Sequence, residues 1–386
     1  MNFDLSDEQR MLAESATRYV REQCTLERKR DIARGDDGYS RERWAEFAGM
    51  GWLALPVSEE SGGLGGGPVE VALLMEALGR GLVNEPVVDS VVLCGALLSH
   101  EQAQGRAGAL LGALIGGDAV PTLAHLEAGE RNEYEAAVAT TARRVEGGWQ
   151  LSGVKHVVRH GHGATHWLVT ARVERVSNET GIALFAVDRT TAGVRVASHR
   201  LIDGTRGADL HFDAISLPAD ALLLAPGPAA LALAEALDRA VLALCAAALG
   251  SMEAVMAMTA DYLKTRVQYG QPLARFQALT HRMAEMFVET EQARAALWRA
   301  IAAVEAAELQ ERARAISAAK WLVARAGLLV TGQGIQLHGG IGVTEEYAVG
   351  HHYKALVAFD KRLGDADFHL LRSSTLFNAH FEPAAA

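Results

Sequence analysis

The chain has 386 residues, of which 49% are hydrophobic and 22% are charged, and its formal net charge is -10. This length and apolar fraction predict a globular protein of two or three domains and exclude a disordered chain. The acidic balance, with no basic run to offset it, excludes a nucleic-acid-binding protein.

Cysteine is rare in the chain. Cys24, Cys94 and Cys245 are far apart and match no metal-binding or redox spacing. Such sparse use of cysteine is typical of a reducing compartment, so we expect a cytoplasmic protein.

Neither the N-terminus nor the most apolar segment predicts a membrane-targeting element. Acidic residues begin at Asp4, which is not the pattern of a signal peptide. The most apolar stretch, residues 229–250, carries Glu235, Asp238 and Arg239 in its middle. Such charges predict a helix buried in protein rather than a membrane span.

Residues 1–118 predict an all-helical N-terminal domain. Ser6 begins the first helix, and Gln9 three residues later completes a capping-box pattern. Further helices are expected over residues 41–50, over residues 69–82, and in segments between residues 87 and 115.

Residues 119–225 predict a β domain. Short strands with no helices between them are typical of a β-barrel or sandwich. The Gly147–Gly148 pair predicts a two-residue hairpin turn. The strands are expected over residues 136–145, 149–158, 167–173, 182–187, 194–201 and 210–217.

Residues 226–386 predict a four-helix bundle. Three long helices are expected over residues 229–264, 276–306 and 311–331, and a fourth helical segment follows Glu345. Their short connections imply antiparallel neighbours, which is the topology of a bundle. The whole chain therefore predicts an α+β fold with helical, β and helical domains in that order.

The segment from Arg266 to Gln277 interrupts the bundle between its first two helices. Pro272 lacks a backbone donor and keeps the preceding residue out of the helical region. An arginine beside an aromatic residue and two amides suits a phosphate-bearing ligand. A capped helix–helix turn without a ligand is the alternative that these residues leave open.

Several motifs in the same order give the chain a family resemblance. The Arg266–Gln277 segment and the Gln336-Leu-His-Gly-Gly-Ile-Gly342 run that follows it resemble the acyl-CoA dehydrogenase family. Further pieces that resemble this family are Met1–Gln9, Gly51–Gly65, Leu151–Lys155 and Phe212–Pro218.

The resemblance implies an activity, a cofactor and partners. The family removes hydrogen from the α and β carbons of an acyl-CoA thioester with FAD, and passes electrons to an electron-transfer acceptor. Fatty acid or steroid catabolism is the expected setting. The resemblance also implies an oligomer, either a homodimer or homotetramer or a heterotetramer with a related chain.

The resemblance also assigns residues to the cofactor. Arg266 is expected to bind the pyrophosphate, Tyr269 to pack nearby, and Gln277 to add a polar contact. The Gln336–Gly340 group is expected to reach the FAD of a neighbouring subunit, with His338 lining the site. The glycines Gly339 and Gly340 permit close approach of the backbone to a phosphate.

The base that removes the α-proton occupies one of two places in the family. The usual place, after the glycine pair, falls here on Leu363, which cannot accept a proton. The other place is on the long helix immediately before an arginine, and here it holds Asp238 before Arg239. We therefore expect Asp238 to be catalytic and Arg239 to lie at the substrate. The alternative is a surface pair of Glu235 and Arg239 with Asp238 solvated beside it.

The expected flavin contacts of the middle domain depart from the family pattern. Leu126 stands where the family has a hydroxyl that touches the flavin. Val157 and Arg159 stand where a tryptophan and a serine or threonine are common. These departures, with Leu363, leave a base-deficient or partner subunit of a hetero-oligomer open, beside a flavin oxidase or a monooxygenase on the same fold.

The histidines do not predict a metal site. His156, His160 and His162 would share one face of a strand, with His166 following. No cysteine or close carboxylate joins them, so we predict no metal. The adjacent pair His351–His352 would point apart and could not chelate.

Overall fold

The computed structural model describes residues 4–176, 179–306 and 308–379. Contacts divide the chain into two compact units, which are described separately. Unit 1 comprises residues 1–29, 68–83 and 241–386, and unit 2 comprises residues 30–67 and 84–240. The boundaries 1–118, 119–225 and 226–386 remain a prediction.

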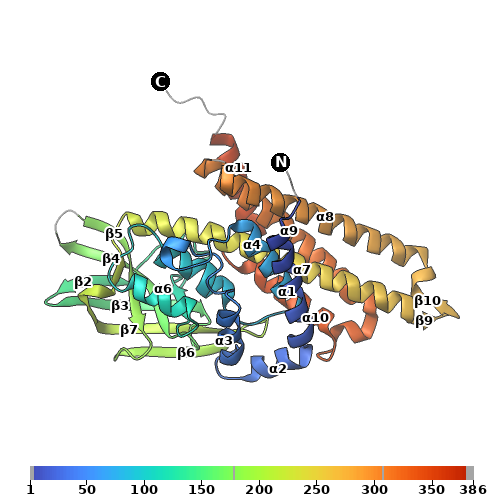
Figure 1. The fold of residues 1–386 in the computed structure, drawn as a ribbon, viewed down its shortest axis with the longest axis horizontal. Helices are drawn as coiled ribbons and strands as arrows, with labels where there is room; N and C mark the ends of the chain where they lie inside the picture. Colours follow the sequence, from blue (N-terminus) through green and yellow to red (C-terminus); the bar gives the residue numbers. More distant parts are fainter. Residues whose placement is uncertain (1–3, 177–178, 307, 380–386) are drawn as a thin grey trace. The chain divides into compact units, whose positions relative to one another are not determined.

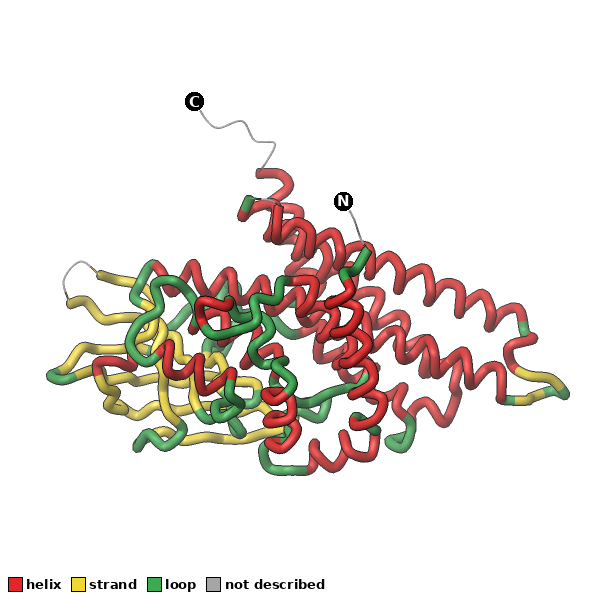
Figure 2. The backbone as a smooth tube through the Cα atoms, viewed as in Figure 1, coloured by secondary structure: helices red, strands yellow, loops and turns green. Residues whose placement is uncertain are grey.

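Unit 2 contains one sheet of eight strands, drawn in yellow in Figure 2. The strands follow the order β6-β7-β3-β2-β4-β5-β8, and β1 pairs with β4. β1 and β2 run parallel to β4, whereas the other pairings are antiparallel. The strands are β1 (Pro121–Ala124), β2 (Thr141–Val145), β3 (Gly148–Arg159), β4 (His166–Val176), β5 (Glu179–Asp188), β6 (Val194–Arg200), β7 (Arg206–Pro218) and β8 (Leu222–Leu224).

The predicted β domain is confirmed, with two local corrections. β2 begins at Thr141 rather than at residue 136. The hairpin turn between β2 and β3 uses Glu146 and Gly147, one residue earlier than predicted, because Val145 pairs with Gly148. Gly147 has φ +80, a conformation that glycine adopts without strain.

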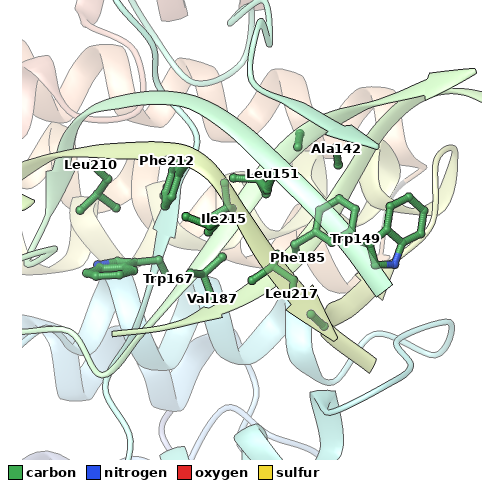
Figure 3. Close-up of a cluster of buried hydrophobic side chains, with 14 of the residues drawn as sticks. Ala142, Trp149, Leu151, Trp167, Phe185, Val187, Leu210, Phe212, Ile215 and Leu217 are labelled. Carbon is green, nitrogen blue, oxygen red and sulfur yellow. The ribbon is translucent and has the colours of Figure 1, made fainter. Parts of the chain in front are cut away.

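The core of unit 2 is formed by apolar side chains from several strands of this sheet (Figure 3). Trp149 on β3 packs edge-on against Phe185 on β5, with ring centroids 5.2 Å apart. Trp167 is fully buried, and its indole N–H donates to the backbone oxygen of Gly161. Alternation along each strand places these residues on one face of the sheet.

Unit 2 also contains short helices. The predicted helical region from residue 87 to 115 is confirmed but is broken into three pieces. The helical elements wholly within unit 2 are α3 (Arg41–Gly49), η1 (Glu59–Ser61), η2 (Val87–Cys94), α5 (Gly95–Leu98), α6 (Ala107–Ile115) and η3 (Ala219–Ala221). Two helices cross between the units: α2 (Leu26–Arg34), which the sequence analysis missed, and α7 (Pro228–Thr265).

Unit 1 is built from long helices, among which α8 and α9 lie side by side (Figure 1). The capping box predicted for Ser6 and Gln9 is present at the start of α1. The helices wholly within the unit are α1 (Asp7–Gln23), α4 (Pro68–Arg80), η4 (Leu273–Arg275), α8 (Gln277–Ala306), α9 (Leu309–His338), η5 (Gly339–Val343), α10 (Ala348–Lys361) and α11 (Ala366–Ala379).

Two glycines allow α4 and α7 to pack closely in unit 1. A Cβ atom on Gly79 would lie 2.0 Å from the backbone oxygen of Ala247. A Cβ atom on Gly250 would lie 1.9 Å from the backbone oxygen of Glu76. Each helix thus has a glycine where the other helix's backbone approaches.

The segment after Glu345 contains two helices, α10 and α11, rather than the single one predicted. Leu363 and Gly364 separate them, because both have positive φ angles, 53° and 87°, that a helix cannot contain. Asp365 then caps α11, since its carboxylate accepts the backbone N–H of Phe368 at 3.0 Å.

α7 and the segment Leu309–Val343 are long and apolar enough to cross a membrane by length and composition. In α7, 67% of the most apolar window is buried inside the protein. Burial of this kind is what the core helix of a bundle requires.

A buried lysine ties together three parts of unit 2. The Lys155 side chain is fully buried, and its ammonium contacts the Glu127 carboxylate at 2.6 Å. Lys155 Nζ also donates to the Thr170 hydroxyl at 3.2 Å. Burial lowers the pKa of Lys155 to about 8, although the Glu127 carboxylate opposes this shift. A charge buried in this way is tolerated because it is paired and hydrogen-bonded.

The chain of hydrogen bonds continues from Thr170 to a histidine. His125 Nε2 lies 3.0 Å from the Glu133 carbonyl oxygen, which can only accept, so this nitrogen carries the proton. His125 Nδ1 then accepts from the Thr170 hydroxyl at 2.7 Å. The pKa of His125 falls to about 4, because burial and the Lys155 ammonium both disfavour the imidazolium. The histidine is therefore neutral at pH 7.

This arrangement predicts a loss of stability in acid. The unfolded chain binds a proton at His125 below about pH 6.5, whereas the folded chain does so only near pH 4. Stability present above pH 6.5 is therefore lost as the pH falls, by about 1.4 kcal/mol per pH unit for this one proton.

The variant His125→Gln isolates this contribution. Urea unfolding at pH 7.5, 5.5 and 4.5 should show a weaker acid dependence in the variant than in the parent. The buried residues His352 and His369, whose pKa values burial lowers to about 3, are common to both proteins and cancel in the difference. Parallel pH profiles for the two proteins would contradict the assignment.

Candidate active site

The Arg266–Gln277 segment forms a hairpin between α7 and α8 in unit 1, visible at one end of these helices in Figure 2. β9 (Val267–Gln268) pairs with β10 (Gln271–Pro272), and η4 (Leu273–Arg275) follows. Tyr269 and Gly270 form the tip, with φ angles of 52° and 78°. Such positive angles are those of a tight two-residue hairpin turn.

Most side chains of this hairpin are exposed. Tyr269 is 93% exposed, and its ring lies edge-on to that of Phe276, with centroids 6.2 Å apart. Arg266 and Gln277 are exposed as well. Their side chains form no ion pair or hydrogen bond with any described residue, so their donors are available to a ligand.

The Gln336–Gly340 segment ends α9. Gln336, Gly339 and Gly340 are exposed, and Gly339 has φ +63. A Cβ atom added at either glycine would meet nothing within 4 Å. Open space and an accessible backbone are what the close approach of a phosphate group needs.

His338 is buried beneath this surface. Its Nδ1 donates to the Gly334 carbonyl at 2.7 Å, and burial lowers its pKa. Its ring packs between Tyr262, with centroids 4.6 Å apart, and Tyr347, with centroids 4.9 Å apart. These contacts are structural, and the expected role of His338 at the cofactor remains a prediction.

Contacts within unit 1 bring the two motifs to the same end of its helices. The ring of Tyr262 packs on His338, and the backbone oxygen of Tyr262 accepts the backbone N–H of Arg266. Arg282 near the start of α8 donates to Gln333 on α9 at 3.1 Å. The guanidinium of Arg266, the amides of Gln277 and Gln336 and the two open glycines therefore lie at this end of unit 1. Such donors fit an anionic, phosphate-bearing ligand.

Asp238 lies on the part of α7 that belongs to unit 2, and it is half-buried. Its Oδ1 accepts a hydrogen bond of 2.7 Å from the hydroxyl of Tyr134. Tyr134 is not among the predicted site residues; it lies 104 residues earlier, in a loop without periodic pattern. The only local signal is Asn132, a residue type that begins such turns.

The predicted neighbours of Asp238 do not behave as the surface-pair alternative requires. Arg239 is exposed and Glu235 is half-buried. These two described side chains do not form an ion pair with each other. Asp238 is half-buried and accepts from Tyr134, so the alternative of a surface pair beside a solvated Asp238 is wrong.

Leu363 fills the other expected place of the base. It is 6% exposed, and its backbone oxygen accepts from His369 Nε2 at 2.7 Å. The nearby acids have structural roles: Asp360 accepts the backbone N–H of Ala366, and Asp365 caps α11.

The middle-domain positions that depart from the family pattern make internal contacts in unit 2. Val157 has φ +50, an unusual angle for a β-branched residue, and its N–H donates to Asp209. Arg159 forms an ion pair with Asp203 and donates to Thr205 at 2.8 Å. Burial alone would raise the pKa of Asp203, but the Arg159 guanidinium holds it well below its usual range.

The clustered histidines pair with separate acids. His156 lies on β3, whereas His160 has φ +54 and lies beyond the strand, so the predicted common face does not form. The ring nitrogens of His156, His160 and His166 lie 3.2, 3.6 and 3.3 Å from Asp209, Asp89 and Asp188, respectively. Among the described residues, no three or more His, Cys, Asp or Glu side chains are arranged to hold a metal ion.

The other predicted histidine pair also separates. His352 is buried and its Nδ1 lies 2.6 Å from the Ser251 hydroxyl. His351 faces Glu345 instead. The two side chains therefore share no ligand position.

Comparison with known proteins matches the chain to three domain families in order. Residues 6–104, 127–215 and 231–368 match the N-terminal, middle and C-terminal domains of acyl-CoA dehydrogenase. The chain is 30% identical over 319 residues to the short-chain specific acyl-CoA dehydrogenase of human mitochondria. This match covers 80% of the chain and 76% of that protein.

Two solved structures share the fold over nearly the whole chain. A variant of the Tcur3481-Tcur3483 steroid acyl-CoA dehydrogenase is 31% identical, with a TM-score of 0.85 and coverage of 97% of this chain and 98% of that one. The ChsE4-ChsE5 complex from Mycobacterium tuberculosis is 26% identical, with a TM-score of 0.85 and full coverage of both chains. The chain therefore belongs to the acyl-CoA dehydrogenase family of flavoenzymes, which use FAD to dehydrogenate acyl-CoA thioesters.

Proposed function

We propose that this acyl-CoA dehydrogenase uses Asp238 as the base that removes the α-proton of its substrate. The observation that carries the proposal is the hydrogen bond from the Tyr134 hydroxyl to the half-buried Asp238 carboxylate. Leu363 supports it, because a buried leucine stands at the other place expected for the base.

The reaction requires two groups to act on adjacent carbons. FAD, when bound, supplies the acceptor for the hydride that leaves the β-carbon. The protein must place a carboxylate against the α C–H bond and hold it there, because catalysis by a base depends on geometry first. The hydrogen bond from the Tyr134 hydroxyl to Asp238 Oδ1 restricts the rotation of this short side chain.

The variant Asp238→Asn tests this assignment. It keeps the shape and the contact with Tyr134 but cannot accept a proton. Flavin reduction by acyl-CoA should slow by roughly 10²–10⁴-fold, the usual contribution of a positioned base. Stopped-flow absorbance of the flavin gives the rate, and FAD content should be unchanged.

Glu235→Gln is the matched control. It removes a carboxylate from the same helix three residues earlier, and flavin reduction should keep the parent rate. Asp238→Asn that reduces the flavin as fast as the parent would remove Asp238 from the mechanism. The acids near Leu363, including Asp367, would then be tested.

We also propose that Arg266, Gln277, Gln336 and the backbone at Gly339 and Gly340 bind FAD, with Tyr269 packing beside it. The residues present fit this cofactor, since exposed donors and open glycines meet at one end of unit 1. Arg266 supplies a fixed positive charge for the pyrophosphate, and the amides add directional hydrogen bonds.

The variant Arg266→Ala should weaken FAD binding about 10- to 100-fold, because a charge-assisted hydrogen bond contributes about 1.5–3 kcal/mol. Titration of apoprotein with FAD, followed by flavin fluorescence, measures the dissociation constant. Arg275→Ala removes the same charge from the same hairpin and should change the affinity far less. Equal losses in both variants would indicate general electrostatics instead of a specific contact.

The assembly is proposed to be an oligomer in which the hairpin is covered. Apolar residues stand exposed on it and near it, with Val267 at 52% and Val343 at 71%. Oligomers of this kind close by symmetry. An electron-transfer acceptor is the proposed oxidant of the reduced enzyme, and the buried, unpaired Cys94 and Cys245 support a proposed cytoplasmic location.

A hetero-oligomer with a related chain is the second candidate. Arg159 and Val157 favour it. At positions where the family presents groups to the flavin, the Arg159 guanidinium is paired with Asp203, and Val157 stands in place of a tryptophan. The similar ChsE4-ChsE5 structure is itself a complex of two chains. In such an assembly the Arg266–Gln277 hairpin of this chain would contact an FAD bound by the partner chain.

Light scattering with FAD quantification separates the two assemblies. We expect a particle of at least twice the 41.2 kDa chain mass. One FAD per chain in protein expressed alone supports the homo-oligomer. FAD uptake only after mixing with a related chain supports the hetero-oligomer. A monomer that holds FAD tightly would contradict both.

A further inference from the structure

Tyr134 reaches Asp238 from a loop whose conformation is fixed locally. Asn132 Oδ1 accepts the backbone N–H of Tyr134 at 3.0 Å and that of Glu135 at 3.1 Å. The Asn132 side chain is buried, and its amide also donates to the Glu135 carboxylate at 3.3 Å. Two backbone amides held by one side chain set the direction in which Tyr134 leaves the loop.

The same loop is fastened to the sheet of unit 2. His125 donates to the carbonyl of Glu133, the residue immediately before Tyr134. His125 in turn accepts from Thr170 on β4, which accepts from the buried Lys155 on β3. The tyrosine backbone is therefore tied to two strands of the sheet through buried hydrogen bonds.

The Tyr134 hydroxyl donates to the Asp238 carboxylate. A 2.7 Å contact between a phenol and a carboxylate oxygen is a short, charge-assisted hydrogen bond. Asp238 has two rotatable side-chain bonds, so such a bond restricts its rotamer. A base held within a fraction of an ångström of its working position reacts faster than a mobile one.

We propose that Tyr134 is a positioning residue, which orients the Asp238 carboxylate toward the α-proton of the acyl-CoA. The inference rests on the proposed role of Asp238 as the base. It assigns Tyr134 no contact with the substrate and no proton to transfer. The loop from His125 to Glu135 then serves to hold the Tyr134 hydroxyl against Asp238 on α7.

The test is a double-mutant cycle in the FAD-loaded protein. Tyr134→Phe should slow flavin reduction about 10- to 100-fold, the equivalent of one hydrogen bond to a charged group. The dissociation constant for acyl-CoA and the FAD content should stay at the parent values. With substrate deuterated at the α-carbon, the isotope effect on reduction should be at least as large as in the parent, because proton removal is the slowed step.

The cycle distinguishes positioning from general packing. In the Asp238→Asn background, Tyr134→Phe should change the rate less than about twofold, because the group it orients is no longer a base. Tyr39→Phe is the matched control. It removes a buried tyrosine hydroxyl of unit 2 that donates to Gly163, and the rate should not change.

A second variant keeps the test decisive if Tyr134→Phe folds poorly. Asn132→Ala retains the hydroxyl and releases the two backbone amides, and it should slow reduction by a smaller factor at unchanged acyl-CoA affinity. Additive effects of Tyr134→Phe and Asp238→Asn would overturn the proposal while leaving Asp238 as the base. If Asp238→Asn alone has no effect, the proposed base fails first, and the two failures are thus separated.

Discussion

The pairing of the buried Lys155 ammonium is the interaction on which the arrangement of much of unit 2 depends. Removing a charge from water is costly, and the cost is offset here by Glu127, the Thr170 hydroxyl and the His125 carbonyl. These partners come from β4 and from the loop after β1, whereas Lys155 itself lies on β3. Satisfying one ammonium therefore fixes the loop that carries Tyr134, and that loop fixes a contact to Asp238. Stability and the geometry of the proposed site are linked through one buried charge.

Much of the fold could be predicted from the sequence because its signals are local. Long apolar periods predicted α7, α8 and α9 to within a few residues, except that α9 continues to His338. Features that depend on unusual backbone angles were harder. Leu363 adopts a positive φ angle, which leucine rarely does, so two helices were predicted as one. Similarly, β1 pairs in parallel with a strand more than forty residues later, which no local pattern reveals.

The same contrast between local sequence signals and long-range contacts applies to the candidate site. Arg266, Gln277 and the Gln336–Gly340 run could be proposed from the sequence because each belongs to a compact motif that resembles the family. Their meeting at one end of unit 1 depends on contacts such as that of Tyr262 with His338. Tyr134 could not be predicted, since its contact with Asp238 depends on the fold of a loop and on a partner 104 residues away. Arg159 was noted as a departure, but its ion pair with Asp203 became visible only in three dimensions.

The most direct test of the account is the structure of the FAD-loaded enzyme with a bound acyl-CoA that cannot be oxidised. The account predicts a carboxylate oxygen of Asp238 about 3–3.5 Å from the α-carbon, the distance of reacting atoms poised for transfer. The Tyr134 hydroxyl should remain on that carboxylate. An α-carbon beyond hydrogen-bond reach of Asp238, with another acid against it, would contradict the central claim.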